Sequence, residues 1–143
     1  MSEYEVQFSD EAYQDFCELF DEGNELFGQE RYNAALSLFA EALEVIPEPV
    51  NEWEETGPLL AAIADVWFMK KDYDKCIDAL NDALECPQAS EVAYLHFRLG
   101  QAYFEKKEMK QAGESFYTAH RLDESIFEDE SPAYIDLLID REK

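Results

Sequence analysis

The chain has 143 residues, of which 47% are apolar and 14% aromatic, which is enough for one domain with its own core. Its net charge of −23 disfavours binding to nucleic acid or anionic membranes and favours a basic protein partner, although surplus acid also keeps an aromatic-rich protein soluble. Cys17, Cys76 and Cys86 have no CxxC spacing, and no secretory signal or membrane-spanning stretch is visible, so we expect a cytoplasmic protein.

The first predicted element is a long helix over about residues 10–28. Ser9 is a suitable N-cap, and the acidic Asp10 and Glu11 that follow are favoured at the positive end of the helix dipole. This region is also the most acidic part of the chain, because residues 1–69 contain seventeen Asp or Glu and one basic residue, Arg31.

A threefold pattern follows along the chain. In each segment a small residue is followed 12 positions later by a second small residue, and then by a large apolar one. The three sets are Gly23, Ala35 and Phe39; Ala64, Cys76 and Leu80; and Gly100, Ala112 and Phe116. Small residues facing each other let two helices approach closely. The pattern resembles the tetratricopeptide-repeat (TPR) family, whose unit is a helix–turn–helix of roughly 34 residues.

The resemblance implies an all-α, TPR-like α-solenoid of three repeats within a single domain spanning 1–143. The repeats are expected at about 16–49, 57–90 and 93–126, with a capping helix at about 131–141, giving about seven helices. The residues between the first two repeats are expected to lengthen the next helix at its N-terminal end, with Pro58 marking a kink or restart. Ser90 is a plausible N-cap for the helix after the second insertion.

We find no pattern that predicts catalysis or a bound cofactor. His96 and His120 have no metal-ligand spacing with cysteines or carboxylates, and the sequence has no glycine-rich phosphate loop and no GxSxG motif. The sequence therefore predicts no enzyme, no cofactor and no metal site.

The first helices of TPR units line a concave surface, so their outward residues form the predicted partner-binding site. These are Phe20, Asn24, Phe27, Asp65, Phe68, Tyr94, Phe97, Gln101 and Phe104. Trp53, Glu54 and Glu55 of the first insertion form a possible acidic and aromatic rim. Aromatic side chains around a polar stripe suit a protein-binding groove. The alternative is that some of these aromatics pack against adjoining repeats.

One known use of the TPR fold is a clamp that grips an acidic C-terminus with Lys, Asn and Arg. Asn24 and Arg98 lie at fitting positions, but Phe20 and Tyr94 stand where lysines are needed. With a net charge of −23, an acidic tail would also be repelled. We therefore do not expect this function.

Residues 47–68, 97–105 and 126–134 together resemble small bacterial TPR immunity proteins of polymorphic (Rhs, contact-dependent or type VI secretion) toxins. The last stretch departs from that family's usual pattern at Ser131 and Ala133. The resemblance implies a toxin inhibitor that binds a cognate toxin domain and blocks its active site or substrate entry. The acidity of the chain favours a basic toxin, with a nuclease as the first expectation and an ADP-ribosyltransferase or a deaminase as the alternative. The alternative is a general TPR adaptor or assembly chaperone that binds a helix or peptide in its groove.

Overall fold

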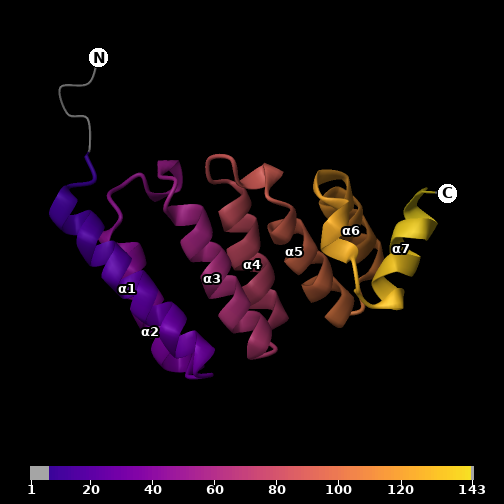
Figure 1. The fold of residues 1–143 in the computed structure, drawn as a ribbon, viewed down its shortest axis with the longest axis horizontal. Coiled ribbons are helices and arrows are strands. Elements are labelled where there is room, and N and C mark those ends of the chain that lie inside the picture. The colour runs from indigo at the N-terminus through magenta and orange to yellow at the C-terminus, as the bar shows by residue number, and fades with distance from the viewer. Residues whose placement is uncertain (1–6, 143) are drawn as a thin grey trace, which may run out of the picture.

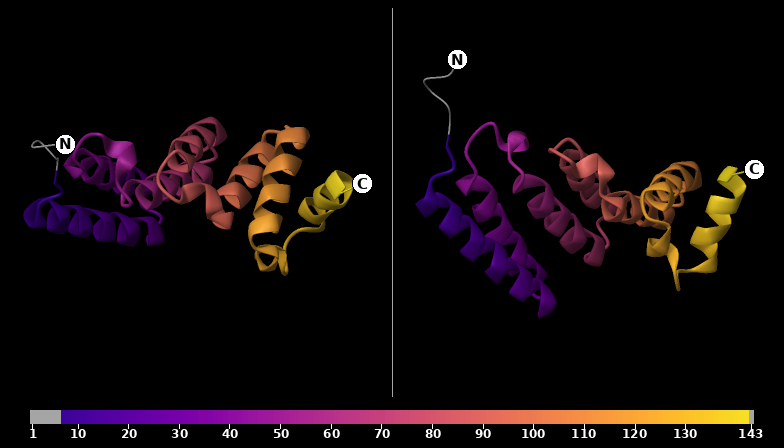
Figure 2. Two further views of the ribbon diagram at one scale, coloured as in Figure 1. Left: turned by 90° about the horizontal axis from the view of Figure 1, so that it is seen from above. Right: turned by 45° about the horizontal axis from the view of Figure 1, so that its top comes forward.

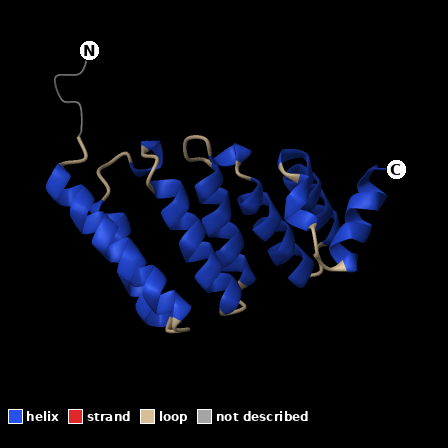
Figure 3. Cartoon of the chain, in the orientation of Figure 1, coloured by secondary structure: helices blue, strands red, loops and turns tan. Residues whose placement is uncertain are grey.

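The computed structural model describes residues 7–142, which fold into helices without any strand (Figure 3). The α-helices are α1 (Asp10–Gly28), α2 (Tyr32–Val45), α3 (Thr56–Met69), α4 (Tyr73–Leu84), α5 (Ala93–Glu105), α6 (Met109–Leu122) and α7 (Pro132–Glu142). Three short 3-10 helices join them: η1 (Val50–Glu52), η2 (Ala89–Glu91) and η3 (Glu124–Phe127). The described part of the chain is thus all-α with seven α-helices, as predicted.

The helices stand side by side in chain order, with α1 and α7 at opposite ends of the row (Figures 1 and 2). The most extensive contacts join α1 to α2, α3 to α4 and α5 to α6, and smaller contacts join one pair to the next. This is a solenoid of three helix pairs, closed by α7 against α6.

The predicted small residues lie where the two helices of a pair approach most closely. A Cβ atom added to Gly23 would overlap the ring of Phe39, and one added to Gly100 would overlap the ring of Phe116. Both rings are fully buried. In the second pair Ala64 takes the place of glycine, and the smaller Leu80 takes the place of the ring.

The turn inside each pair has the same geometry. Glu30, Lys71 and Lys107 each adopt a left-handed backbone conformation, with φ between 62° and 65°. The next amide donates to a carbonyl five residues earlier, as Arg31 does to Leu26 over 2.9 Å. This is the Schellman motif, which glycine usually completes. Here glutamate and lysine complete it at a steric cost.

Two predictions about the insertions are wrong. Residues 50–52 form the separate helix η1, and α3 begins only at Thr56, whose hydroxyl donates to the carbonyl of Val50. Pro58 lies in the first turn of α3, where a new helix starts, so it marks the restart that was predicted as the alternative to a kink. Ser90 caps no α-helix, because it lies within η2 and α5 begins at Ala93.

The predicted helix starts at the two ends are present. The Ser9 hydroxyl accepts a hydrogen bond from the amide of Ala12 at 3.1 Å, and α1 runs over the predicted residues. At the other end, the Ser131 hydroxyl accepts from the amide of Ala133 at 3.2 Å, where α7 begins. Leu138 of α7 is buried against the third helix pair, so this helix covers the end of the core.

Candidate protein-binding site

The first helices of the pairs, α1, α3 and α5, carry most of the predicted binding residues. Asn24 and Tyr94 are exposed, and the side chains of Phe20, Phe27, Asp65, Phe68, Gln101 and Phe104 are half-buried. We call these eight residues together with Arg98 the A-helix face. Its aromatic rings also make contacts within the fold: Phe27 lies 5.6 Å from Tyr32, and Phe68 lies 5.4 Å from Tyr73, between ring centroids.

Phe97 does not belong to this face, which corrects the prediction from the sequence. Its side chain is only 6% exposed. The ring centroids of Phe116, Phe127 and Tyr134 lie 5.7, 5.1 and 6.1 Å from its own. Since η3 and α7 fold back over the third helix pair, they cover Phe97 and make it part of the core.

Trp53 of the predicted rim is also packed into the fold. Its ring lies 5.4 Å from that of Phe8, and it contacts the core of the first repeat. Its indole nitrogen Nε1 is buried without a hydrogen-bond partner. Glu54 is exposed, whereas Glu55 and Trp53 are half-buried, so Glu54 is the most accessible residue of the predicted rim.

Arg98 of α5 is the centre of a polar network that joins α5 to α3. Its Nε donates to Asp65 Oδ1 at 3.0 Å, and its two terminal nitrogens donate to the Tyr94 hydroxyl at 2.9 Å and to Gln101 Oε1 at 3.0 Å. The Tyr94 hydroxyl in turn donates to Asp65 Oδ1 at 2.8 Å. The guanidinium also stacks on the ring of Phe68, with its carbon 4.3 Å from the ring centroid.

The surroundings of this network alter the pKa values of its acids. Burial raises the pKa of the Asp65 carboxyl, and the neighbouring Arg98 guanidinium offsets this only in part. Burial together with the Asp65 charge raises the pKa of Tyr94 to about 12, so its hydroxyl stays a hydrogen-bond donor at neutral pH. Asp65 balances the charge of Arg98, and all three guanidinium nitrogens of Arg98 donate hydrogen bonds within the network.

Sequence reasoning placed Arg98 at a clamp position but missed its pairing with Asp65. The signal was available, because the two residues are 33 positions apart, about one repeat, and have opposite charges. Opposite charges one repeat apart on first helices can meet when those helices lie next to each other.

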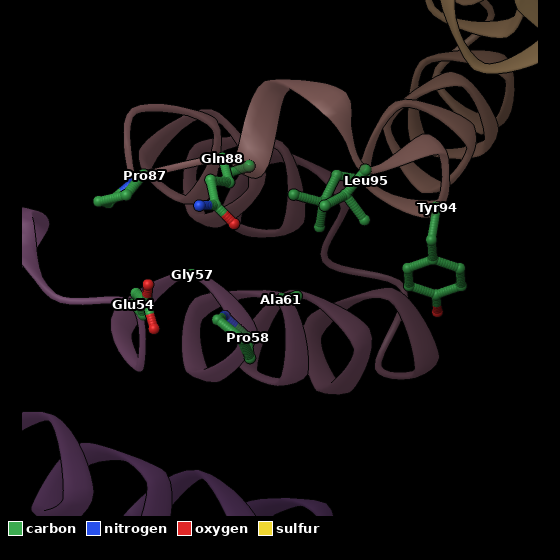
Figure 4. Close-up of a pocket in the computed structure, with 10 residues that line it drawn as sticks. Glu54, Gly57, Pro58, Ala61, Pro87, Gln88, Tyr94 and Leu95 are labelled. Atoms are coloured by element: carbon green, nitrogen blue, oxygen red, sulfur yellow. The ribbon is translucent and has the colours of Figure 1, made fainter. Parts of the chain in front are cut away.

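A pocket of about 340 Å³ opens beside this network, between the start of α3 and the start of α5 (Figure 4). Its walls come from Gly57, Pro58 and Ala61 on one side and from Val92, Tyr94 and Leu95 on the other. Glu54 and the segment Pro87, Gln88 and Ala89 complete it. Both predicted insertions thus contribute to this pocket, the one between the first two repeats through Glu54 and the one between the last two repeats through Pro87, Gln88 and Ala89.

The charges of the described residues are unevenly distributed. Helix α1 carries seven acidic residues, and all of them are exposed. Six lysines, which we call the lysine edge, lie in the turns of the second and third pairs and in the first turns of the helices that follow: Lys70, Lys71, Lys75, Lys106, Lys107 and Lys110. Lys106 forms ion pairs with Asp74 and Glu108, and Lys70 donates to Asn33.

Two other kinds of site are absent from residues 7–142. No group of His, Cys, Asp or Glu in this range could hold a metal ion. No helix in the same range has the length and apolar character needed to cross a membrane.

Comparison with known proteins identifies the fold. Residues 93–126 match the family model of the tetratricopeptide repeat, over the range predicted for the third repeat. The chain has the TPR fold. A C-terminal TPR-containing domain of a putative FK506-binding protein from Plasmodium falciparum superposes with a TM-score of 0.71 at 22% identity, covering 99% of this chain and 100% of that one.

Two further TPR structures are complexes with peptides. The first TPR of Spaghetti (RPAP3), bound to the HSP90 peptide SRMEEVD, has a TM-score of 0.70 at 17% identity, over 89% of this chain and 90% of that one. The second TPR domain of human RPAP3, with the HSP70 peptide SGPTIEEVD, has a TM-score of 0.70 at 15% identity, over 92% and 98%. No curated protein matches the sequence. None of these comparisons indicates a catalytic family.

Proposed function

We propose that this chain is a protein-binding adaptor module that holds a basic, amphipathic segment of its partner against the A-helix face. The TPR fold supports binding of a helix or an extended peptide. Two of the structural neighbours are complexes with peptides. The half-exposed aromatic rings supply apolar contact area. The seven exposed acidic residues of α1 supply negative charge.

The pairing of Arg98 with Asp65 is the observation that supports a basic partner in this proposal. Both chaperone peptides named above end in Glu-Glu-Val-Asp and are acidic. Of the nine residues of the A-helix face, Arg98 is the only cation, and Asp65 already neutralises it. An acidic peptide would have to displace this bond in a protein of net charge −23, whereas a basic segment would be attracted.

Peptide binding to matched variants tests this proposal. The probes are two fluorescein-labelled 12-residue amphipathic peptides that differ only in having Lys or Glu at their polar positions, and the readout is fluorescence anisotropy. Asn24→Lys adds a positive charge to the α1 part of the A-helix face, and Gln111→Lys adds the same charge at an exposed position on α6. We expect binding of the Lys peptide only, weakened by salt and selectively weakened by Asn24→Lys.

Two results would contradict the proposal. One is equal or tighter binding of the Glu peptide, which would mean that the acidic field does not select the partner. The other is an equal effect of the two lysine variants, which would place the contact away from the A-helix face and leave only non-specific charge attraction.

A toxin-neutralising function is the more specific form of this proposal. It rests on the resemblance of the sequence to immunity proteins and on the charge, since a basic nuclease domain would be attracted to this surface. The two peptide complexes favour the general adaptor instead. Co-purification with the product of the adjacent gene, at low and high salt, separates the two: an inhibited toxin supports immunity, and a non-toxic partner contradicts it.

A further inference from the structure

The pocket between α3 and α5 has apolar walls, and part of its lining is buried in the fold. Ala89 and Leu95 are 5% and 4% exposed, and Gly57 is buried as well. Val92 and Tyr94, in contrast, are 45% and 38% exposed. The pocket thus has buried lining residues at its base and exposed apolar side chains, Val92 and Tyr94, at its opening.

The lining of the pocket carries a negative charge and no positive one. Among its ten lining residues, Glu54 is the only charged one. It is exposed and lies at one end of the pocket, while Tyr94 lies at the other (Figure 4). The half of the chain that supplies Glu54 contains seventeen acidic residues and only one basic residue. The ligand that fits is therefore elongated, apolar along its length and cationic at its end.

We propose that this pocket binds an arginine side chain of the partner protein, an inference that rests on the proposed adaptor function. The methylene stem lies between Pro58 and Ala61 on one wall and Val92 and Leu95 on the other. Its guanidinium reaches Glu54 at the mouth. Basic side chains commonly bury their stems on apolar surface while the charged end stays in water. Arginine fits better than lysine, because its planar guanidinium binds a carboxylate through two parallel hydrogen bonds.

The test is an NMR titration of the ¹⁵N-labelled full-length chain with three small probes. N-butylguanidinium carries both stem and charge, guanidinium carries the charge alone, and pentanamide carries a stem of similar length without charge. We expect saturable shifts of the Gly57, Ala61 and Ala89 amides with N-butylguanidinium, and much weaker ones with the other two. Because this experiment needs no partner, its failure would leave the peptide-binding result untouched, and the reverse also holds.

Variants make the assignment specific. Glu54→Gln removes the charge at the pocket, and Glu52→Gln is its control, since Glu52 is exposed on η1 but does not line the pocket. Glu54→Gln should weaken N-butylguanidinium binding about three- to fivefold, as expected for an exposed charge pair, and Glu52→Gln should not.

Ala61→Leu fills the pocket and should abolish the shifts, with circular dichroism showing that the fold is kept. Equal responses to butylguanidinium and pentanamide, or equal effects of the two Gln variants, would overturn the proposal.

Discussion

The first and third repeats are packed alike inside and covered differently outside. Gly23 against Phe39 and Gly100 against Phe116 form the same close approach. Phe20 and Phe97 also occupy the same position within their repeats, yet Phe20 stays half-exposed whereas Phe97 lies beneath Phe127 and Tyr134. The repeat pattern therefore determines how a helix pair packs, and the segment after the last repeat determines which part of the A-helix face remains open.

The largest expected effect comes from removing the two equivalent phenylalanine rings. Phe97→Ala should lower the free energy of unfolding by about 3–5 kcal/mol, because it leaves a cavity in the core. Phe20→Ala should cost only about 1–2 kcal/mol, because its ring is partly in water already. Urea denaturation of both variants measures this difference. Equal losses would mean that the C-terminal segment does not seal the third repeat.

The close approach inside the pairs should respond in the same way in both repeats. Gly23→Ala and Gly100→Ala should each destabilise the fold by about 1–3 kcal/mol, because the added methyl overlaps a buried ring. Adding Phe116→Leu to Gly100→Ala should recover part of this loss, since the second repeat pairs Ala64 with Leu80. If the double variant in thermal denaturation is no better than the single one, ring overlap is not the cause.

The polar network joins only the second and third repeats, since the first repeat has the exposed Asn24 at the position of Asp65. Tyr94→Phe should cost about 1 kcal/mol at pH 8 through the lost hydrogen bond. The pKa of Tyr94 is raised from 10.0 to about 12, so its contribution is complete below pH 10 and is lost as the pH rises towards 12. The stability difference between wild type and variant should therefore shrink between pH 8 and pH 11. A constant difference would contradict the network.

The smallest effect concerns the turns, which are the same in all repeats. Glu30→Gly, Lys71→Gly and Lys107→Gly should each stabilise the chain by about 0.5–1 kcal/mol, because glycine adopts the left-handed conformation without steric cost. Gln29→Gly is the control and should destabilise, since the φ of Gln29 is −88°. Thermal denaturation measures both. A gain in one repeat alone would show that the turns are not equivalent.

Spacing within the sequence was enough to predict the helix pairs, their small residues and the capping helix. These features depend on contacts close together in the chain. The burial of Phe97 depends on where residues 124–138 return, and that of Trp53 depends on Phe8, which is 45 positions away. The Asp65–Arg98 bond depends on how two repeats are placed side by side. Periodicity carries no information about where a distant segment returns, so the burial of Phe97 and Trp53 could not be predicted. The Asp65–Arg98 pair, in contrast, was indicated by opposite charges about one repeat apart.

The lysine edge gives the protein an electric dipole in addition to its net charge. The seven acidic residues of α1 lie at one end of the row, and the six lysines lie in and directly after the turns of the second and third repeats. The field of an approaching basic protein exerts a torque on such a charge distribution and turns α1 towards it. At 0.1 M salt this reorientation acts within about 10 Å of contact, so the module is already aligned when the surfaces meet.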